Sequence, residues 1–128
     1  MAALDITIEE KRTETGIRLS TSFQIQDKSH ELWFEVPHRF QSWLTTTADP
    51  FLLAILFPAM HANLPVTIRN RRVSRALIRN LYEVQRAWNQ WKPDQYHIIS
   101  IHAVAEEEFP LNAEKAVCAF TGGIDGAF

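Results

Sequence analysis

Hydrophobic and polar residues alternate along the first third of the chain, in a pattern that is typical of β-strands. Apolar side chains occupy every second position in residues 4–8, and a longer alternation of the same kind covers residues 17–25. A third strand is predicted for residues 32–36, where Pro37 ends it. Short turn-forming segments separate these strands, which favours an antiparallel meander. We expect later parts of the chain to cover one face of this meander.

A strongly apolar segment at residues 51–60 predicts a helix that is buried on almost all sides. Asp49 is the predicted N-cap, and Pro50 occupies the first helical position, where its missing backbone N–H is not needed. Pro58 is expected to kink or shorten this helix, because it cannot donate to the preceding turn. Asn63 and the residues after it are expected to end the helix.

A second helix is predicted for residues 75–91, with Ser74 as its N-cap. A strand is predicted for residues 96–104, and an acidic connector then leads to a last apolar strand at residues 115–120. The apolar stripe of the helix steps by three and four positions, through Leu77, Leu81, Val84, Trp88 and Trp91.

These elements predict an α+β fold with an N-terminal antiparallel strand meander, two main helices and two late strands. A chain of 128 residues with 46% hydrophobic and 22% charged residues can bury a core, and this composition argues against disorder. The net charge of -2 gives no reason to expect nucleic acid or a membrane surface as a partner. No apolar run is long enough to span a bilayer. The lack of a signal-peptide pattern and the single cysteine, Cys118, predict a cytoplasmic protein.

The histidines and the cysteine do not predict a metal site. His97 and His102 are the closest pair of the five histidines, and at a spacing of five in a strand they would point to opposite faces. Cys118 lies within an apolar strand, which predicts a packed, inert thiol rather than a nucleophile.

Arginine is concentrated just before and within the second predicted helix. Three of these residues, Arg72, Arg75 and Arg79, would share one helical face. One interpretation is an anion-binding patch for phosphate, RNA or a nucleotide substrate. The other is a solvated helix face whose arginines pair with Glu83 or with the acidic run at residues 106–108. An RNA-binding surface would interleave aromatic residues, and none occurs between positions 69 and 79. The full patch comprises Arg69, Arg71, Arg72, Arg75 and Arg79.

The last residues of the sequence contain a glycine turn directly after the predicted strand at 115–120. In such a turn, glycine lets the backbone approach a ligand closely, and a helix start that follows directs N–H groups at phosphate. The segment Thr121-Gly-Gly-Ile-Asp-Gly126 resembles the pyrophosphate-binding loop of the N-type ATP pyrophosphatase (PP-loop) superfamily. That pattern is an apolar strand, then Ser-Gly-Gly-aliphatic-Asp-Ser, then a helix. Gly126 departs from it by removing the second hydroxyl group.

The resemblance implies a site that holds the phosphates of ATP, with Mg²⁺, while a small-molecule substrate is adenylated. Thr121, Gly122 and Gly123 would then contact phosphate, and Asp125 would contact phosphate or Mg²⁺. Residues 1–114 would be an N-terminal α+β accessory module.

Residues 115–128 would be the strand and the truncated pyrophosphate-loop start of a following nucleotide-binding domain. The parent is expected to be an ATP-dependent adenylating ligase or synthase, of which this chain is an N-terminal fragment that is inactive alone. The alternative is a non-enzymatic protein-interaction or assembly domain. Its apolar helix at residues 50–60, or its edge strands, would then mediate contacts in a homo-oligomer.

Overall fold

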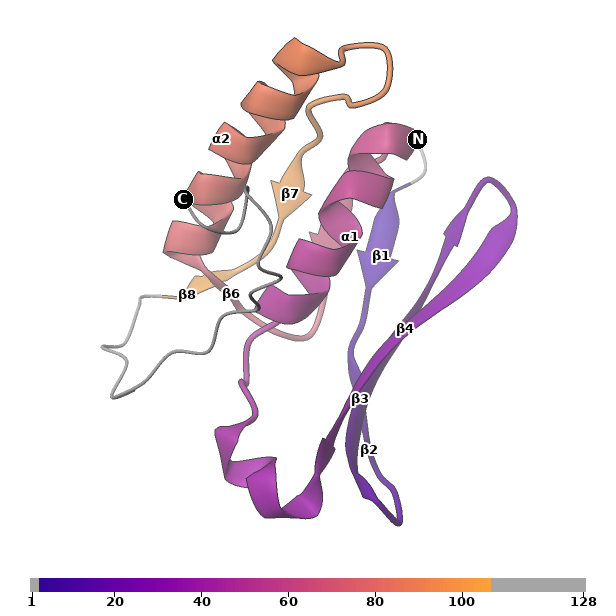
Figure 1. The fold of residues 1–128 in the computed structure, drawn as a ribbon, viewed down its shortest axis with the longest axis vertical. Coiled ribbons are helices and arrows are strands. Elements are labelled where there is room, and N and C mark those ends of the chain that lie inside the picture. Colours follow the sequence, from indigo (N-terminus) through magenta and orange to yellow (C-terminus); the bar gives the residue numbers. More distant parts are fainter. Residues whose placement is uncertain (1–2, 107–128) are drawn as a thin grey trace, which may run out of the picture.

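The structure, a computed structural model, describes residues 3–106 of the chain. It confirms the predicted α+β class, because two α-helices lie beside a small parallel sheet and a long antiparallel hairpin extends next to them (Figure 1). The predicted last strand, at residues 115–120, lies outside the described residues. The parallel sheet has the order β1-β5-β7, with β1 at Leu4–Ile6, β5 at Val66–Ile68 and β7 at Ile101–His102.

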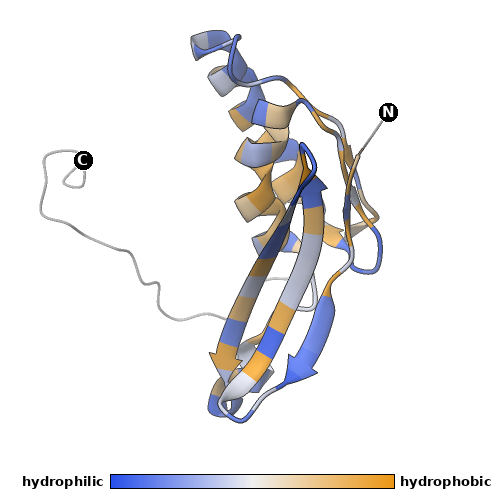
Figure 2. Ribbon diagram, turned by 90° about the vertical axis from the view of Figure 1, so that its right-hand side faces the viewer, coloured by the Kyte–Doolittle hydropathy of each residue, from blue (hydrophilic) through white to orange (hydrophobic). Residues whose placement is uncertain are grey.

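The antiparallel meander is present, but its first strand is not the one that the sequence predicts. Residues 4–6 pair in parallel with β5, and the next strand along the chain joins the meander instead. Alternation predicts which side chains are buried but not which strand is the partner, so this pattern could not separate the two sheets. Figure 2 shows the alternation of polar and hydrophobic residues along the two long strands. The meander consists of β2 (Glu9–Arg12), β3 (Gly16–Ile25) and β4 (Lys28–Pro37), followed by the 3₁₀ helix η1 (His38–Trp43).

Both helices cover the same face of the parallel sheet, where the core lies. The apolar side chains of the sheet, including Ile6 and Val66, point into this core and are fully buried. The opposite face carries polar residues such as Asp5 and His102, which are exposed. The parallel sheet is therefore one-sided, with one face packed and one face in water.

Helix α1 (Asp49–Ala62) differs from the prediction at its N-cap and at Pro58. Its N-cap is Ala48, and the Asp49 carboxylate instead accepts a hydrogen bond from the backbone N–H of Ser74 at 2.9 Å. The helix continues through Pro58 rather than being shortened there. Because Pro58 has no backbone N–H, the Ala54 carbonyl lacks its helical hydrogen bond. Both residues are exposed, so water can donate a hydrogen bond to this carbonyl instead. Asn63 ends the helix, as predicted, and it does so in a left-handed conformation.

Helix α1 is also less buried than the sequence predicts. One face is fully packed, but the other exposes Leu53 at 53% and Phe57 at 37%. Within the described residues, no helix is long and apolar enough to cross a bilayer. The buried face of α1 contains Phe51, Leu52, Ile55, Leu56, Ala59 and Met60.

Helix α2 (Arg75–Trp91) begins as predicted, because the Ser74 hydroxyl accepts a hydrogen bond from the Leu77 N–H. Of its predicted apolar stripe, Leu81 is buried, whereas Trp91 is 68% exposed in the last turn of the helix. This helix leads from the two-residue strand β6 (Val73–Ser74), which pairs in parallel with β8 (Ala105–Glu106).

The sequence predicts a strand at residues 96–104, but polar side chains of α2 bind part of the backbone of this segment. Gln85 is fully buried, and its Oε1 atom accepts a hydrogen bond from the Ile99 N–H at 2.7 Å. The Tyr82 hydroxyl accepts one from the Ile101 N–H at 3.1 Å. Side chains of the helix therefore bind two backbone N–H groups of this segment, and the strand is limited to β7 and β8.

Candidate functional site

The four residues that join β5 to β6, Arg69 to Arg72, form a bulged loop that we call the arginine loop. Val66 pairs with Ile101 and Val73 pairs with Ala105, so the chain advances seven residues on the β5–β6 side and only four on the β7–β8 side. The additional residues are pushed out of the ladder. Because β1, β5 and β7 are parallel, this loop lies at their carboxyl ends, which is where open α/β sheets commonly bind ligands.

Backbone and side-chain hydrogen bonds hold the arginine loop on two sides. The Asn70 amide binds both the N–H and the carbonyl of Ile8, at 2.9 and 2.7 Å. On the other side, the Arg72 carbonyl accepts a hydrogen bond from the Ala48 N–H at 2.9 Å, just before α1. The loop therefore has a defined position relative to both β1 and α1.

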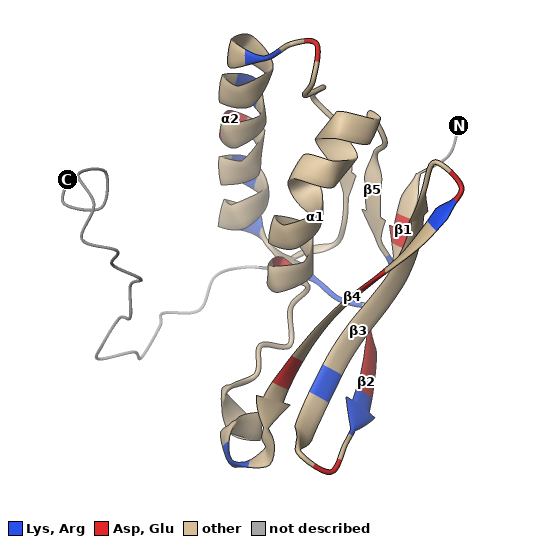
Figure 3. Cartoon of the chain, turned by 45° about the vertical axis from the view of Figure 1, so that its right-hand side comes forward, with Lys and Arg blue, Asp and Glu red and all other residues tan. Residues whose placement is uncertain are grey.

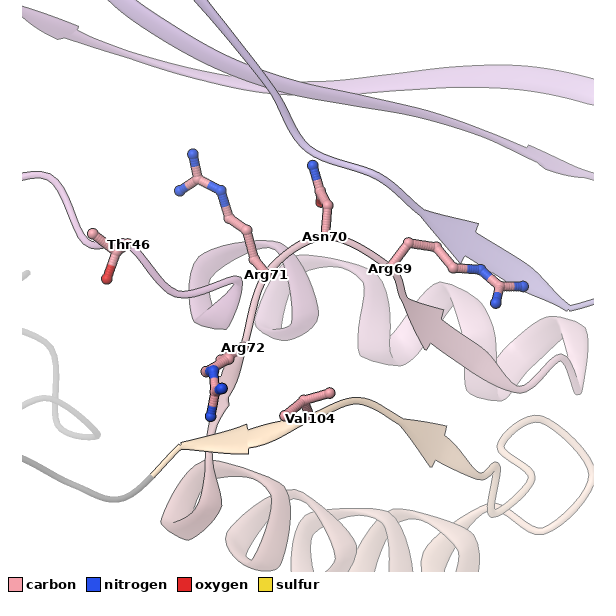
Figure 4. Close-up of a pocket in the computed structure, with 6 residues that line it drawn as sticks. All are labelled: Thr46, Arg69, Asn70, Arg71, Arg72 and Val104. Atoms are coloured by element: carbon pink, nitrogen blue, oxygen red, sulfur yellow. The ribbon is translucent and has the colours of Figure 1, made fainter.

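The arginines of the loop point in different directions, as Figure 4 shows. Arg69 extends along β1 and forms an exposed ion pair with Asp5, at 2.7 Å. Arg71 is mostly buried and binds Glu10 at 3.3 Å and the Thr45 carbonyl at 3.4 Å. These two residues fit the interpretation in which the arginines pair with carboxylates, although the partners differ from those predicted.

Arg72 differs from the other two arginines of the loop. Within residues 3–106, its guanidinium group makes no hydrogen bond or ion pair. The prediction that it shares a helical face with Arg75 and Arg79 is wrong, because α2 begins only after Ser74. Figure 3 shows the basic segment between β5 and α2 as separate from the arginines along α2. The structure therefore divides the predicted patch into a loop part and a helix part.

Two open hollows of about 400 Å³ each lie beside the arginine loop. The first is lined by Thr46, Val104 and all four residues of the loop. The second lies between the loop and η1. Both are within the size range of small-molecule sites, about 300–1,000 Å³. Arg71, Asn70 and Thr46 line both hollows. The second hollow is lined by Glu10, Leu19, Gln41, Leu44, Thr45, Thr46, Asn70 and Arg71.

A hydrogen-bonded carboxylate elsewhere in the fold, Glu35, has a structural role. It accepts hydrogen bonds from the hydroxyl groups of Thr15 and Thr13, at 2.7 and 3.0 Å, and pairs with Arg18 at 3.3 Å. The Thr15 hydrogen bond is the largest of the effects that lower the pKa of Glu35. Burial, the second-largest effect, raises it, and the Thr13 hydrogen bond and the charge and hydrogen bond of Arg18 lower it further. These contacts tie the β2–β3 turn to β4.

The predicted phosphate-contacting residues Thr121, Gly122, Gly123 and Asp125 lie outside the described residues, as does Cys118. Among residues 3–106, no three His, Cys, Asp or Glu side chains gather in a way that could hold a metal ion. No protein-family model, curated protein or solved structure matches the chain.

The sequence did not point to Asn70 and Thr46 as site residues. Asn70 stands between arginines, where an asparagine is typical of a turn. Its partner Ile8 lies 62 positions away, and no local pattern indicates that contact. Thr46 belongs to a run of three threonines without a distinguishing spacing.

Proposed function

We propose that this chain supplies the N-terminal module of an ATP-dependent, adenylating ligase or synthase of the PP-loop type. The observation that carries the proposal is the sequence Thr121-Gly-Gly-Ile-Asp-Gly126 directly after an apolar strand pattern. In such a loop, backbone N–H groups face phosphate, and Asp125 supplies a carboxylate for phosphate or Mg²⁺ chemistry.

The described residues support an accessory role for the N-terminal module. Among the described residues, apolar side chains between Leu4 and Ile101 form one core. The module therefore has the packing of a folded unit that is able to precede a nucleotide-binding domain.

The first test reads the gene beyond the codon for Phe128. The proposal expects further strand–helix units after the motif, and a stop codon there would contradict it. The second test measures exchange of labelled pyrophosphate into ATP by the whole gene product. Asp125→Asn should abolish the exchange, whereas Asp94→Asn, in the loop after α2, should retain it. Equal exchange by the two variants would contradict the proposal.

A third test uses the 128 residues alone. A helix of several turns is needed to direct a dipole at phosphate, and the three residues after Asp125 cannot form one. We therefore expect calorimetry with ATP and Mg²⁺ to show no micromolar binding. Micromolar binding that Asp125→Asn removes would show that the motif is already functional in this chain.

The second candidate function is protein interaction or assembly, and the exposed face of α1 favours it. Leu53 and Phe57 are exposed there, and the Phe57 ring contacts Trp88 of α2 edge-on, with the ring centroids 5.2 Å apart. Trp88 in turn contacts the exposed Trp91, at 5.5 Å. The two helices thus present a connected apolar and aromatic surface of the kind that interfaces use.

Sedimentation at high protein concentration tests this second function. If the surface mediates self-association, the wild-type chain should sediment as a dimer or larger species, and Leu53→Lys should shift it to the monomer. Gln90→Lys, at an exposed position of α2, is the matched control and should leave the assembly unchanged. A wild-type monomer at all concentrations would contradict assembly through this surface.

A further inference from the structure

The first hollow beside the arginine loop contains hydrogen-bond donors that have no partner in the part of the chain that the structure describes. Within residues 3–106, the Arg72 guanidinium and the Thr46 hydroxyl have no hydrogen-bonding partner. The same is true of the backbone N–H groups of Asn70, Arg71 and Arg72. All four residues line the same open hollow (Figure 4). A guanidinium group, a hydroxyl group and backbone N–H groups therefore lie around one hollow, and of these donors only the guanidinium carries a full charge.

The carboxylates close to this loop are already engaged. Asp5 is paired with Arg69 and Glu10 with Arg71, while Asp49 accepts the Ser74 N–H. The charges of Asp5 and Glu10 balance those of Arg69 and Arg71, whereas Arg72 forms no ion pair among the described residues. An anion that enters the hollow would therefore meet a guanidinium group that needs no rearrangement of an existing ion pair.

The loop is held in place before any ligand arrives. The Asn70 amide fixes it to Ile8, and the Arg72 carbonyl accepts the Ala48 N–H. A site with a fixed backbone loses less conformational entropy on binding than a loop that must first become ordered. Its place at the carboxyl ends of β5 and β7 is also where parallel sheets commonly receive ligands.

We propose that this hollow binds the phosphate group of a small molecule, with Arg72, Thr46 and the backbone of the arginine loop as its contacts. A guanidinium fork, a hydroxyl and successive N–H groups match the several acceptor oxygens of phosphate. The hollow suits a single small ligand rather than a strand of RNA. The loop contains no aromatic residue on which bases would stack, and the chain has a net charge of -2.

The residues of this site lie between Thr46 and Val104 and include none of the PP-loop motif, which begins at Thr121. The proposal therefore does not depend on the proposed adenylating function. Loss of phosphate binding in Arg72→Gln would concern the hollow alone, and loss of pyrophosphate exchange in Asp125→Asn would concern the motif alone.

Amide chemical shifts in ¹H–¹⁵N NMR spectra of the 128-residue chain test the proposal directly. Titrations use orthophosphate, pyrophosphate and a nucleoside monophosphate at low ionic strength, where screening is weak. We expect saturable shifts at Asn70, Arg71, Arg72 and Thr46 with at least one of these probes. Tighter binding of the nucleoside monophosphate than of orthophosphate would indicate a nucleotide, and equal binding would indicate recognition of phosphate alone.

Two arginine variants give the matched comparison. Arg72→Gln should weaken binding by about tenfold or more, because it removes a charge-assisted hydrogen bond. Arg79→Gln removes the same charge from an exposed position of α2 and should leave the affinity within about twofold. Thr46→Ala should weaken binding less than Arg72→Gln, because the hydroxyl is neutral. Both arginines are exposed, so the thermal midpoints of all variants should stay close to the wild-type value.

Three results would overturn the proposal. The first is the absence of saturable shifts in the arginine loop with every phosphate probe. The second is an equal loss of affinity in Arg72→Gln and Arg79→Gln, which would indicate a diffuse charge effect. The third is binding of a single-stranded RNA oligomer at this loop while the small phosphates fail to bind.

Discussion

The side-chain amide of Asn70 acts as a strand partner for the backbone of Ile8. Its Nδ2 atom donates to the Ile8 carbonyl at 2.7 Å, and its Oδ1 atom accepts the Ile8 N–H at 2.9 Å. The β1–β5 ladder ends at the pair Ile6 and Ile68, two residues before Ile8. One side chain therefore extends the hydrogen-bonding pattern of the sheet beyond its last backbone pair and fixes the arginine loop against the junction of β1 and β2.

Replacing Asn70 should test this bridge. Asn70→Ala leaves both polar groups of the Ile8 backbone without their protein partner, which should lower the free energy of unfolding by roughly 1–3 kcal/mol. Urea denaturation followed by circular dichroism measures this change. Asn80→Ala, at an exposed position of α2, is the control and should have little effect. If both variants unfold at the same urea concentration, the bridge does not stabilise the fold.

Gln85 offers a second test, of how α2 holds the segment before β7. Gln85→Met keeps the approximate size of this fully buried side chain but removes the acceptor for the Ile99 N–H. We expect a loss of roughly 1–3 kcal/mol in the free energy of unfolding. The Nε2 atom of Gln85 is itself buried without a partner, and removing it offsets part of this loss.

Hydrogen exchange locates the effect of Gln85→Met. The Ile99 amide should exchange faster relative to the core amides of α1, whose protection should fall only with global stability. Gln90→Met, five residues further along α2 and exposed, should change neither quantity. Unchanged protection of Ile99 would argue against the Gln85 hydrogen bond.

Gly16, at the start of β3, lies against the backbone of β4. A Cβ atom at this position would come within 2.1 Å of the Val36 carbonyl oxygen. That atom belongs to the backbone, so the strands would have to separate, and Gly16→Ala should destabilise the protein by about 1–3 kcal/mol or more. Thermal unfolding measures the effect, and Ser20→Ala in the same strand is the control. A melting midpoint equal to that of the control would contradict this close approach.

The lowered pKa of Glu35 predicts a specific dependence of stability on pH. Its contribution to stability is fully present above the pKa of the unfolded chain, about 4.3 for an ordinary glutamate. As the pH falls through this value and then through the lower pKa of the folded state, the contribution is lost. The difference in thermal midpoint between wild type and Glu35→Gln should therefore be constant near neutral pH and shrink below about pH 4.3. A difference that does not change with pH would show that the ionised carboxylate is not responsible.

Local patterns in the sequence predicted the helices well because their signals lie within a few residues. Ser74 caps α2 through an N–H three positions away, and Asn63 ends α1 through the turn before it. The cap at Asp49 failed for a tertiary reason. Its carboxylate is taken by the Ser74 N–H, a group that lies 25 positions further along the chain.

Sheet pairing and the candidate site could not be predicted in the same way. The alternation at residues 4–8 correctly marks Leu4, Ile6 and Ile8 as buried, but it contains no information about the parallel partner. The arginine run was visible in the sequence as an anion-binding candidate. Which arginine of the loop has no ion-pair partner among residues 3–106 depends on Asp5 and Glu10, and only the fold brings these carboxylates to the loop.

The order of strands in the parallel sheet has a consequence for synthesis on the ribosome. The hairpin of β3 and β4 pairs segments that are adjacent in the sequence, so it can form early. The pairing of β1 with β5 requires Val66, and the pairing of β5 with β7 requires Ile101. During translation, the buried face of α1 therefore has no completed sheet to pack on until Ile101 has emerged. Nascent chains that stall before this point would expose that face, which makes them natural substrates for chaperones that bind apolar segments.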